Sequence, residues 1–256
     1  MDSSGFLLLA QTGRVRRITL NRPEKRNAMT PAMEDAFFQC IAEAMDDDDT
    51  GVVVLAGAGP AFCSGADVSA GSQGEAPAAS VRDAAGDMAT NRRRVERWLQ
   101  LWSAPKPLIA QVHGYCLGTA NELVACCDLV ICGTSARFGM PEVRSFALPP
   151  TLAFWPARIG LMRTKELLFT GRLVDGAEAV ALGMALEVVP DGELSARVDA
   201  LASTIAETDP RLLATTKQAA NAWFEAAGGR QAALGGAEYH AIFHQASAWG
   251  VKGQGA

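Results

Sequence analysis

Long apolar runs and an excess of basic residues are both missing from this 256-residue chain. No apolar stretch approaches the ~20 residues that a helix needs to cross a bilayer, so no membrane association is expected. The N-terminus, Met1–Phe6, has no basic segment before its apolar residues. The sequence therefore predicts no signal peptide and a cytoplasmic protein. With a net charge of −5, nucleic acid is not expected as the main partner.

Several motifs that bind metals or nucleotides are missing as well. No two cysteines have CxxC spacing, and most of the six lie in apolar stretches (Cys40, Cys63, Cys116, Cys126, Cys127, Cys132). Buried, reduced thiols fit this pattern better than a disulfide framework or a metal site, and no metal is expected. Neither GxGxxG nor a P-loop occurs, which argues against a pyrophosphate bound in the Rossmann manner.

Alternating strand and helix patterns fill the first half of the chain. Short apolar runs at 51–57, 107–112 and 129–132 predict buried strands. Thr30 and Pro31 predict the start of a helix, as N-cap and first helical residue. Strand, crossover helix and strand in this order predict right-handed β-α-β units and hence an α/β fold.

Helical patterns alone remain after about Asp191. They cover 193–207, 210–226 and 230–249. We therefore divide the chain into a core, residues 1–190, and a C-terminal helical region, residues 191–256.

Glycine-bearing turns follow two of the predicted strands. Phe62–Asp67 comes after the strand that ends at Leu55, and Gly118 lies between the strand 107–112 and a helix predicted at 122–127. Because the carboxyl ends of parallel strands meet at one edge of a sheet, we expect the two turns to lie side by side where α/β proteins bind ligands. Unpaired backbone N–H groups from two such turns can form an oxyanion hole.

Two glutamates, Glu122 and Glu142, lie twenty positions apart, and each is in a local sequence that turns sharply from a strand to a helix or loop. Paired carboxylates act as general acid and base when they share a pocket. Beside free backbone N–H groups, such a pair can add water to a polarised double bond or remove it.

Five groups of segments follow one another at suitable spacing. They are Ile18–Met29, Ala61–Asp67, Lys106–Gly114, Phe138–Glu142, and Leu168–Gly171 with Ala177–Gly183 and Val188–Pro190. On these segments the chain resembles the enoyl-CoA hydratase/isomerase (crotonase) superfamily over nearly its whole length. The resemblance implies a crotonase (ClpP-like) β-β-α spiral core. It also implies that the C-terminal helical region supports homotrimers or dimers of trimers.

The resemblance also implies roles for particular residues. The two oxyanion-hole N–H groups fall on Ala66 and Thr119. Glu122 orients and deprotonates a water molecule that adds at C3 of an acyl-CoA thioester, and Glu142 supplies the proton at C2. No cofactor is implied, because coenzyme A is part of the substrate.

Other residues are implied to contact the substrate. They are Lys25, Arg26, Ala28, Ser64, Gly65, Asp67 and Gly118, with Lys25 and Arg26 in the loop that contacts CoA. The run Arg92–Arg94 is predicted instead to be a solvated helix face.

Two departures from the family pattern affect the substrate. Thr119 stands where the family usually has glycine, and it narrows the acyl pocket. The segment Phe146–Pro156 is bulky where hydratases carry a glycine-rich stretch. The predicted activity is that of an enoyl-CoA hydratase of fatty acid metabolism. An enoyl-CoA isomerase, an acyl-CoA hydrolase and a non-catalytic acyl-CoA-binding protein are the alternatives, and the presence of both glutamates favours hydration.

Overall fold

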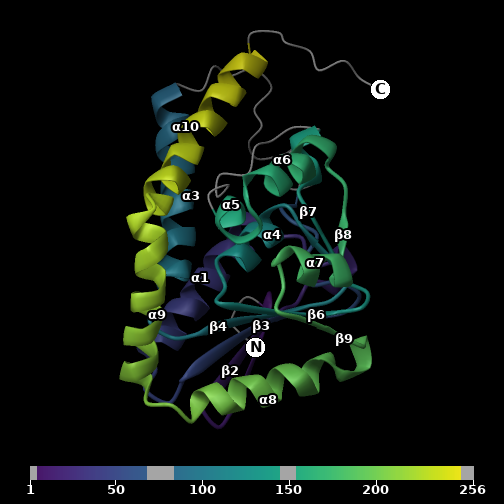
Figure 1. Cartoon of the computed structure of the whole chain (residues 1–256), viewed down its shortest axis with the longest axis vertical. Helices are drawn as coiled ribbons and strands as arrows, with labels where there is room; N and C mark the ends of the chain where they lie inside the picture. The colour runs from purple at the N-terminus through teal and green to yellow at the C-terminus, as the bar shows by residue number, and fades with distance from the viewer. Residues whose placement is uncertain (1–4, 68–83, 145–153, 249–256) are drawn as a thin grey trace.

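The computed structural model describes residues 5–67, 84–144 and 154–248 (Figure 1). The main sheet contains β1 (Leu7–Thr12), β2 (Val15–Leu20), β3 (Val52–Gly57), β4 (Leu108–Val112), β6 (Leu129–Gly133) and β9 (Glu187–Val189). A smaller sheet contains β5 (Tyr115–Leu117), β7 (Arg137–Gly139) and β8 (Val174–Asp175). The α-helices are α1 (Pro31–Asp46), α3 (Ala84–Trp102), α4 (Thr119–Ala125), α5 (Phe154–Ile159), α6 (Leu161–Thr170), α7 (Gly176–Leu182), α8 (Leu194–Ala206), α9 (Pro210–Ala226) and α10 (Gly229–Ala248). The short 3₁₀ helices of the described ranges are η1 (Pro23–Lys25), η2 (Pro141–Arg144) and η3 (Asp191–Glu193).

The main sheet has the strand order β1-β2-β3-β4-β6-β9. Every pair from β2 to β9 is parallel, and only β1 runs antiparallel to its neighbour. The three predicted buried strands are β3, β4 and β6, which lie next to one another with helices between them in the chain. This arrangement confirms the predicted α/β class. It also brings the carboxyl ends of β3 and β4 to the same edge.

Both faces of the main sheet are buried at β3, which explains why this strand is apolar throughout. Val53 and Leu55 face a large core shared with α1, α3 and α4. Val52 and Val54 face a second core against α8. Alternate residues of a strand point to opposite faces, so one continuous apolar run supplies both cores.

Local signals determine where two helices begin. Thr30 caps α1, because its side chain accepts a hydrogen bond from the Met33 N–H at 3.2 Å, and Pro31 is the first helical residue. The helix predicted at 122–127 begins earlier, at Thr119. The correction arises at Gly118, whose φ of +53° lets the chain turn directly from β5 into α4.

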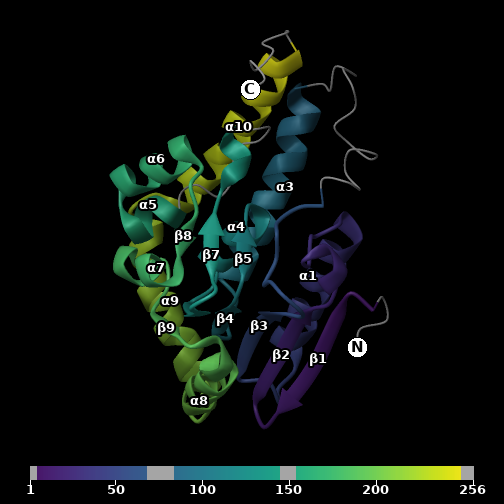
Figure 2. The ribbon, with the colours of Figure 1, turned by 90° about the vertical axis from the view of Figure 1, so that its right-hand side faces the viewer.

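The three C-terminal helices lie where the sequence predicts them, within the described residues. α8 lies across one face of the main sheet, while α10 runs alongside α3 (Figures 1 and 2). None of the described helices is long and apolar enough to span a membrane. The division of the chain at residue 190 stays a prediction.

Candidate active site

Two loops at the carboxyl edge of the main sheet are joined by backbone hydrogen bonds. The first loop, residues 58–67, follows β3, and the second loop, residues 113–118, follows β4 and includes β5. The Cys63 N–H donates to the Tyr115 carbonyl at 2.9 Å, and the Leu117 N–H donates back to the Cys63 carbonyl at 3.1 Å. The two turns therefore lie side by side, as the sequence predicts.

Gly65 allows the two loops to approach closely. Its φ of +101° is rarely adopted by residues with a side chain. A Cβ at this position would lie 2.8 Å from the Leu117 carbonyl oxygen and 3.7 Å from the Thr119 nitrogen. The space between Gly65, the second loop and the start of α4 therefore has no room for a side chain at position 65.

The backbone N–H groups of Ala66 and Thr119 donate no hydrogen bond within the described part of the chain, although their neighbours do. The Asp67 N–H donates to the Met29 carbonyl, and the Gly118 N–H donates to the Gly139 carbonyl, both at 2.9 Å. Ala66 is exposed, and Thr119 is the first residue of α4, where an N–H has no acceptor within its own helix, so both amides are free to bind a ligand. This is the arrangement that an oxyanion hole requires.

Glu122 lies three residues after Thr119 in α4, and only 2% of its surface is exposed. Side chains three apart on a helix lie on the same face, so this carboxyl group is on the side of α4 that carries Thr119. A carboxyl group in such a buried position has few competing water contacts, which suits acid–base chemistry.

Glu142 belongs to η2, and its side chain lies outside the described residues. The backbone leading to it is well placed beside the second loop. β7 pairs with β5 so that Gly139 is opposite Leu117, and the next residue after Leu117 donates to the Gly139 carbonyl. The chain therefore enters η2 next to the residues that precede α4.

The predicted substrate-contact segment around Arg26 runs beside the first loop. The Ser64 N–H donates to the Arg26 carbonyl at 2.9 Å, and the Met29 N–H donates to the Gly65 carbonyl at 2.8 Å. Lys25 and Arg26 have exposed side chains, whereas Ala28 is buried. These residues thus border the same edge of the sheet as Ala66.

Asp67 is buried and serves as an anchor for this region. Its carboxylate accepts a hydrogen bond from the Arg22 guanidinium, which also donates to the Ala28 carbonyl at 3.0 Å. A carboxylate held in an ion pair fits a structural role better than acid–base chemistry.

Arg94 is the residue near this site that the sequence did not reveal. Arg92 and Arg93 are exposed, as predicted for a solvated face, but for Arg94 the prediction was wrong. Its Nη2 donates to Thr119 Oγ1 at 3.2 Å. A signal was present in the spacing, because position 94 lies between the buried residues Asn91 and Trp98 at helical intervals.

The bulky segment predicted at Phe146–Pro156 is only partly described, since residues 145–153 lie outside the described ranges. Phe154 and Trp155 are buried at the start of α5. Phe154 stacks on Phe224 of α9, with ring centroids 4.9 Å apart. These aromatic side chains therefore join the core to the C-terminal helices.

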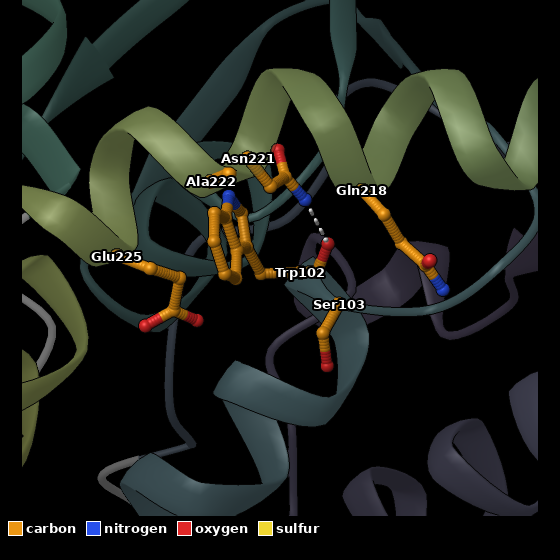
Figure 3. Close-up of a pocket in the computed structure, with 6 residues that line it drawn as sticks. All are labelled: Trp102, Ser103, Gln218, Asn221, Ala222 and Glu225. Atoms are coloured by element: carbon orange, nitrogen blue, oxygen red, sulfur yellow. Dashed lines mark hydrogen bonds between the residues drawn. The ribbon is translucent and has the colours of Figure 1, made fainter.

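A separate hollow of about 280 Å³ lies between the end of α3 and α9 (Figure 3). It is lined by Trp102, Ser103, Gln218, Asn221, Ala222 and Glu225. A side-chain hydrogen bond across it joins Asn221 Nδ2 to the Trp102 carbonyl at 3.4 Å. None of the predicted site residues lines this hollow, so it is distinct from the candidate site.

All six cysteines are buried and none is in a disulfide, which confirms that part of the sequence prediction. Burial raises the pKa of Cys63, in the first loop, to about 12. A thiol with so high a pKa is not a nucleophile at neutral pH.

Comparison with known proteins places these observations in a family. Residues 10–254 match the family model described as enoyl-CoA hydratase/isomerase. A probable mitochondrial enoyl-CoA hydratase of Dictyostelium discoideum is 33% identical over 83% of this chain and 74% of its own length. A 2,3-dehydroadipyl-CoA hydratase of Escherichia coli is 31% identical, over 83% of this chain and 80% of its own.

Solved structures of enoyl-CoA hydratases are similar to this chain as well. The crystal structure of a probable enoyl-CoA hydratase from Mycobacterium thermoresistibile superimposes with a TM-score of 0.86 at 31% identity, covering 96% of this chain and 99% of that one. The similarity therefore extends through the core and the C-terminal helices together.

Proposed function

Because this chain belongs to the enoyl-CoA hydratase/isomerase family, we propose that it catalyses the reversible addition of water to a trans-2-enoyl-CoA thioester. Its fold is accordingly the crotonase fold that the sequence predicted. The observation that carries the proposal is the pair of unpaired N–H groups on the adjoining loops, with the Glu122 carboxyl group one helical turn away.

The N–H groups of Ala66 and Thr119 would receive the thioester oxygen. Hydrogen bonds to that oxygen draw electrons from the conjugated double bond and make C3 electrophilic. Negative charge then grows on the oxygen as water adds, so the bonds strengthen in the transition state. A hole of two fixed backbone donors contributes about 3 kcal/mol for each donor.

Glu122 would orient a water molecule and take its proton as the oxygen bonds to C3. Glu142 would deliver a proton to C2 as the thioester carbonyl is restored. The burial of Glu122 supports its part, because little bulk water competes for this carboxyl group. The backbone position of η2 beside the second loop supports the part of Glu142.

The CoA portion would lie over Lys25 and Arg26. Their exposed cationic side chains border the first loop and suit its phosphate groups. Ala28, Ser64, Gly65, Asp67 and Gly118 would form the backbone and walls around the thioester. We further propose that the enzyme uses no metal or redox cofactor, since the acid, the base and the oxyanion donors are all supplied by the chain.

The proposal also covers how the subunits assemble and where the enzyme is located. Large apolar side chains are exposed on α6, notably Met162 at 79% and Phe169 at 75%. Exposed apolar clusters commonly mark contacts between subunits. We propose that residues 191–256 and this face support a homotrimer or a dimer of trimers in the cytoplasm. Light scattering on purified protein would measure the assembly directly.

The test is a spectrophotometric screen of enoyl-CoA thioesters of varied chain length. Hydration removes the conjugated double bond, so absorbance should fall, and the product should be heavier by one water. Mass analysis separates the alternatives, because an isomerase leaves the mass unchanged and a hydrolase releases free CoA thiol. Unchanged thioesters throughout the screen would refute the proposal.

A further inference from the structure

Thr119 presents a side-chain hydroxyl beside the proposed oxyanion hole, and Arg94 holds it. Arg94 Nη2 donates to Thr119 Oγ1 at 3.2 Å, and the same nitrogen lies 3.5 Å from Glu34 Oε2. Glu34 is in the first turn of α1, and only 14% of its side chain is exposed. A carboxylate, a guanidinium and a hydroxyl thus form a chain from α1 through α3 to the first residue of α4.

The hydrogen of this hydroxyl has no acceptor within the described part of the chain. An arginine side chain can only donate, so Thr119 Oγ1 accepts from Arg94 and its own O–H remains to be used. Several other helical threonines donate to the carbonyl four residues earlier, as Thr90 does to Gly86 and Thr164 to Gly160, both at 2.9 Å. Thr119 makes no such bond.

The hydroxyl lies close to the proposed hole because it belongs to the same residue as one of the two N–H donors. Oγ1 is separated from the Thr119 nitrogen only by Cα and Cβ, so the two donors can converge on one acceptor. Threonine is branched at Cβ and has few χ1 states. The bond from Arg94 favours one of them, in a residue that is only 9% exposed.

We propose that the Thr119 hydroxyl is a third hydrogen-bond donor to the thioester oxygen, and that Arg94 is its positioning residue. The proposal rests on the hydratase function proposed above. Arg94 also polarises the hydroxyl, because a hydroxyl that accepts a bond from a cation becomes a stronger donor. Glu34 keeps Arg94 in place and balances its charge.

This assignment gives the unusual residue at position 119 a chemical role. A threonine in place of glycine takes space from the acyl pocket, but it also adds a donor where negative charge develops. The donor acts on the transition state more than on the ground state, so it should raise kcat and leave KM nearly unchanged.

The first experiment measures steady-state kinetics of Thr119→Val, Thr119→Ser, Arg94→Met and Arg94→Lys. Thr119→Val removes the hydroxyl at nearly constant volume and should lower kcat about tenfold to a hundredfold. Thr119→Ser should retain most of kcat. Arg94→Met should lower kcat by a smaller factor, and Arg94→Lys should recover part of it.

Matched controls come from the same helix. Arg93 Nη2 donates to Thr90 Oγ1 at 3.2 Å, which is the same kind of bond on the exposed face of α3. Arg93→Met and Thr90→Val should leave kcat and KM unchanged. Thermal unfolding of every variant identifies any that fails to fold, and Thr119→Ser with Arg94→Lys keep the test valid in that case.

The second experiment measures hydrogen bonding to the thioester oxygen without turnover. Butanoyl-CoA cannot be hydrated, and its ¹³C-labelled carbonyl stretch falls in frequency as donors polarise it. The shift on binding should be largest in the wild type, smaller in Arg94→Met and smallest in Thr119→Val. Equal shifts in wild type and Thr119→Val would overturn the inference and leave the proposed function intact. No shift in the wild type, together with no hydration of any enoyl-CoA, would overturn the proposed function itself.

Discussion

A buried ion pair attaches the C-terminal helices to the sheet, and its removal gives a quantitative test of the structure. Lys217 of α9 places Nζ 2.7 Å from Asp128 Oδ2, just before β6, and donates to the Lys106 carbonyl at 3.3 Å. Only 7% of the Lys217 side chain and 22% of the Asp128 side chain are exposed. The same carboxylate oxygen accepts the Leu108 N–H at 2.8 Å. Lys217→Met keeps the apolar stem and removes the charge.

The expected loss of stability in Lys217→Met follows from the distance between the two charges. At an effective dielectric constant of about 20, charges at this distance attract by about 6 kcal/mol, and the desolvation of the ammonium group offsets part of that. Removal of one partner of a buried pair costs about 3 kcal/mol, because the remaining charge loses its counter-ion. With a denaturant slope of about 3 kcal/mol/M, the urea midpoint at pH 7 should fall by about 1 M.

The loss should depend on pH. Burial raises the pKa of Asp128 even though Lys217 lowers it, and without Lys217 that pKa should rise further. An aspartate whose folded-state pKa is raised binds its proton more tightly in the folded protein than in the unfolded chain. The charged carboxylate therefore reduces stability at neutral pH, and protonation relieves this as the pH falls through the folded-state pKa. The difference between wild type and variant should accordingly shrink in acid.

The assay is urea unfolding at one fixed protein concentration, followed by circular dichroism at pH 7 and again in mild acid. Arg211→Met on the same helix is the matched control, since Arg211 is 94% exposed and 3.7 Å from Asp209. It should change the midpoint little. Asp128→Asn combined with Lys217→Met should recover part of the loss. A Lys217→Met variant as stable as the control at pH 7 would refute the buried-pair reasoning.

Three further predictions concern the site. Gly65→Ala should lower both stability and kcat, because its Cβ would clash with the second loop at 2.8 Å. In the control Gly13→Ala the Cβ meets nothing within 4 Å, so kcat should be unchanged. Thermal unfolding measures the stability of both variants, and steady-state kinetics measures their kcat. Glu122→Gln should lower kcat by a factor of about 10²–10⁴ and leave substrate binding intact. The control Glu96→Gln should match the wild type in the same assay. Near-normal turnover by Glu122→Gln would rule out the role of Glu122 as base. Thiol reagents at pH 8 should label none of the cysteines of the folded protein and all six after unfolding. All six are buried, and burial raises the pKa of Cys63 to about 12. Rapid labelling of the folded protein would contradict these buried positions.

The sequence predicted the central strands well because their signal is local. β3, β4 and β6 are short apolar runs, and a parallel strand covered on both faces needs just that composition. The start of α1 was predictable for a similar reason, because the Thr30 side chain caps an N–H three residues away and Pro31 fixes its own backbone. The start of α4 was placed too late, because the turn at Gly118 depends on a pairing with β7 that no local pattern reveals.

The candidate site was predictable only in part. The resemblance of the sequence to a family placed Ala66, Thr119 and Glu122, and the structure supplies the distances between their loops. The run Arg92–Arg94 looked like one uniform basic face. Tertiary contacts separate its members, since two point to solvent and Arg94 turns toward Thr119.

Composition and local pattern by themselves determined the α/β class, the buried thiols and the glycines at which the chain turns. These properties follow from hydrophobic periodicity and backbone conformation, which a short segment carries within itself. The tertiary structure alone decided which amides remain unpaired and which arginine reaches Thr119 at the start of α4. Those depend on hydrogen bonds and ion pairs between residues far apart in the chain, such as Arg94 with Thr119 and Cys63 with Tyr115.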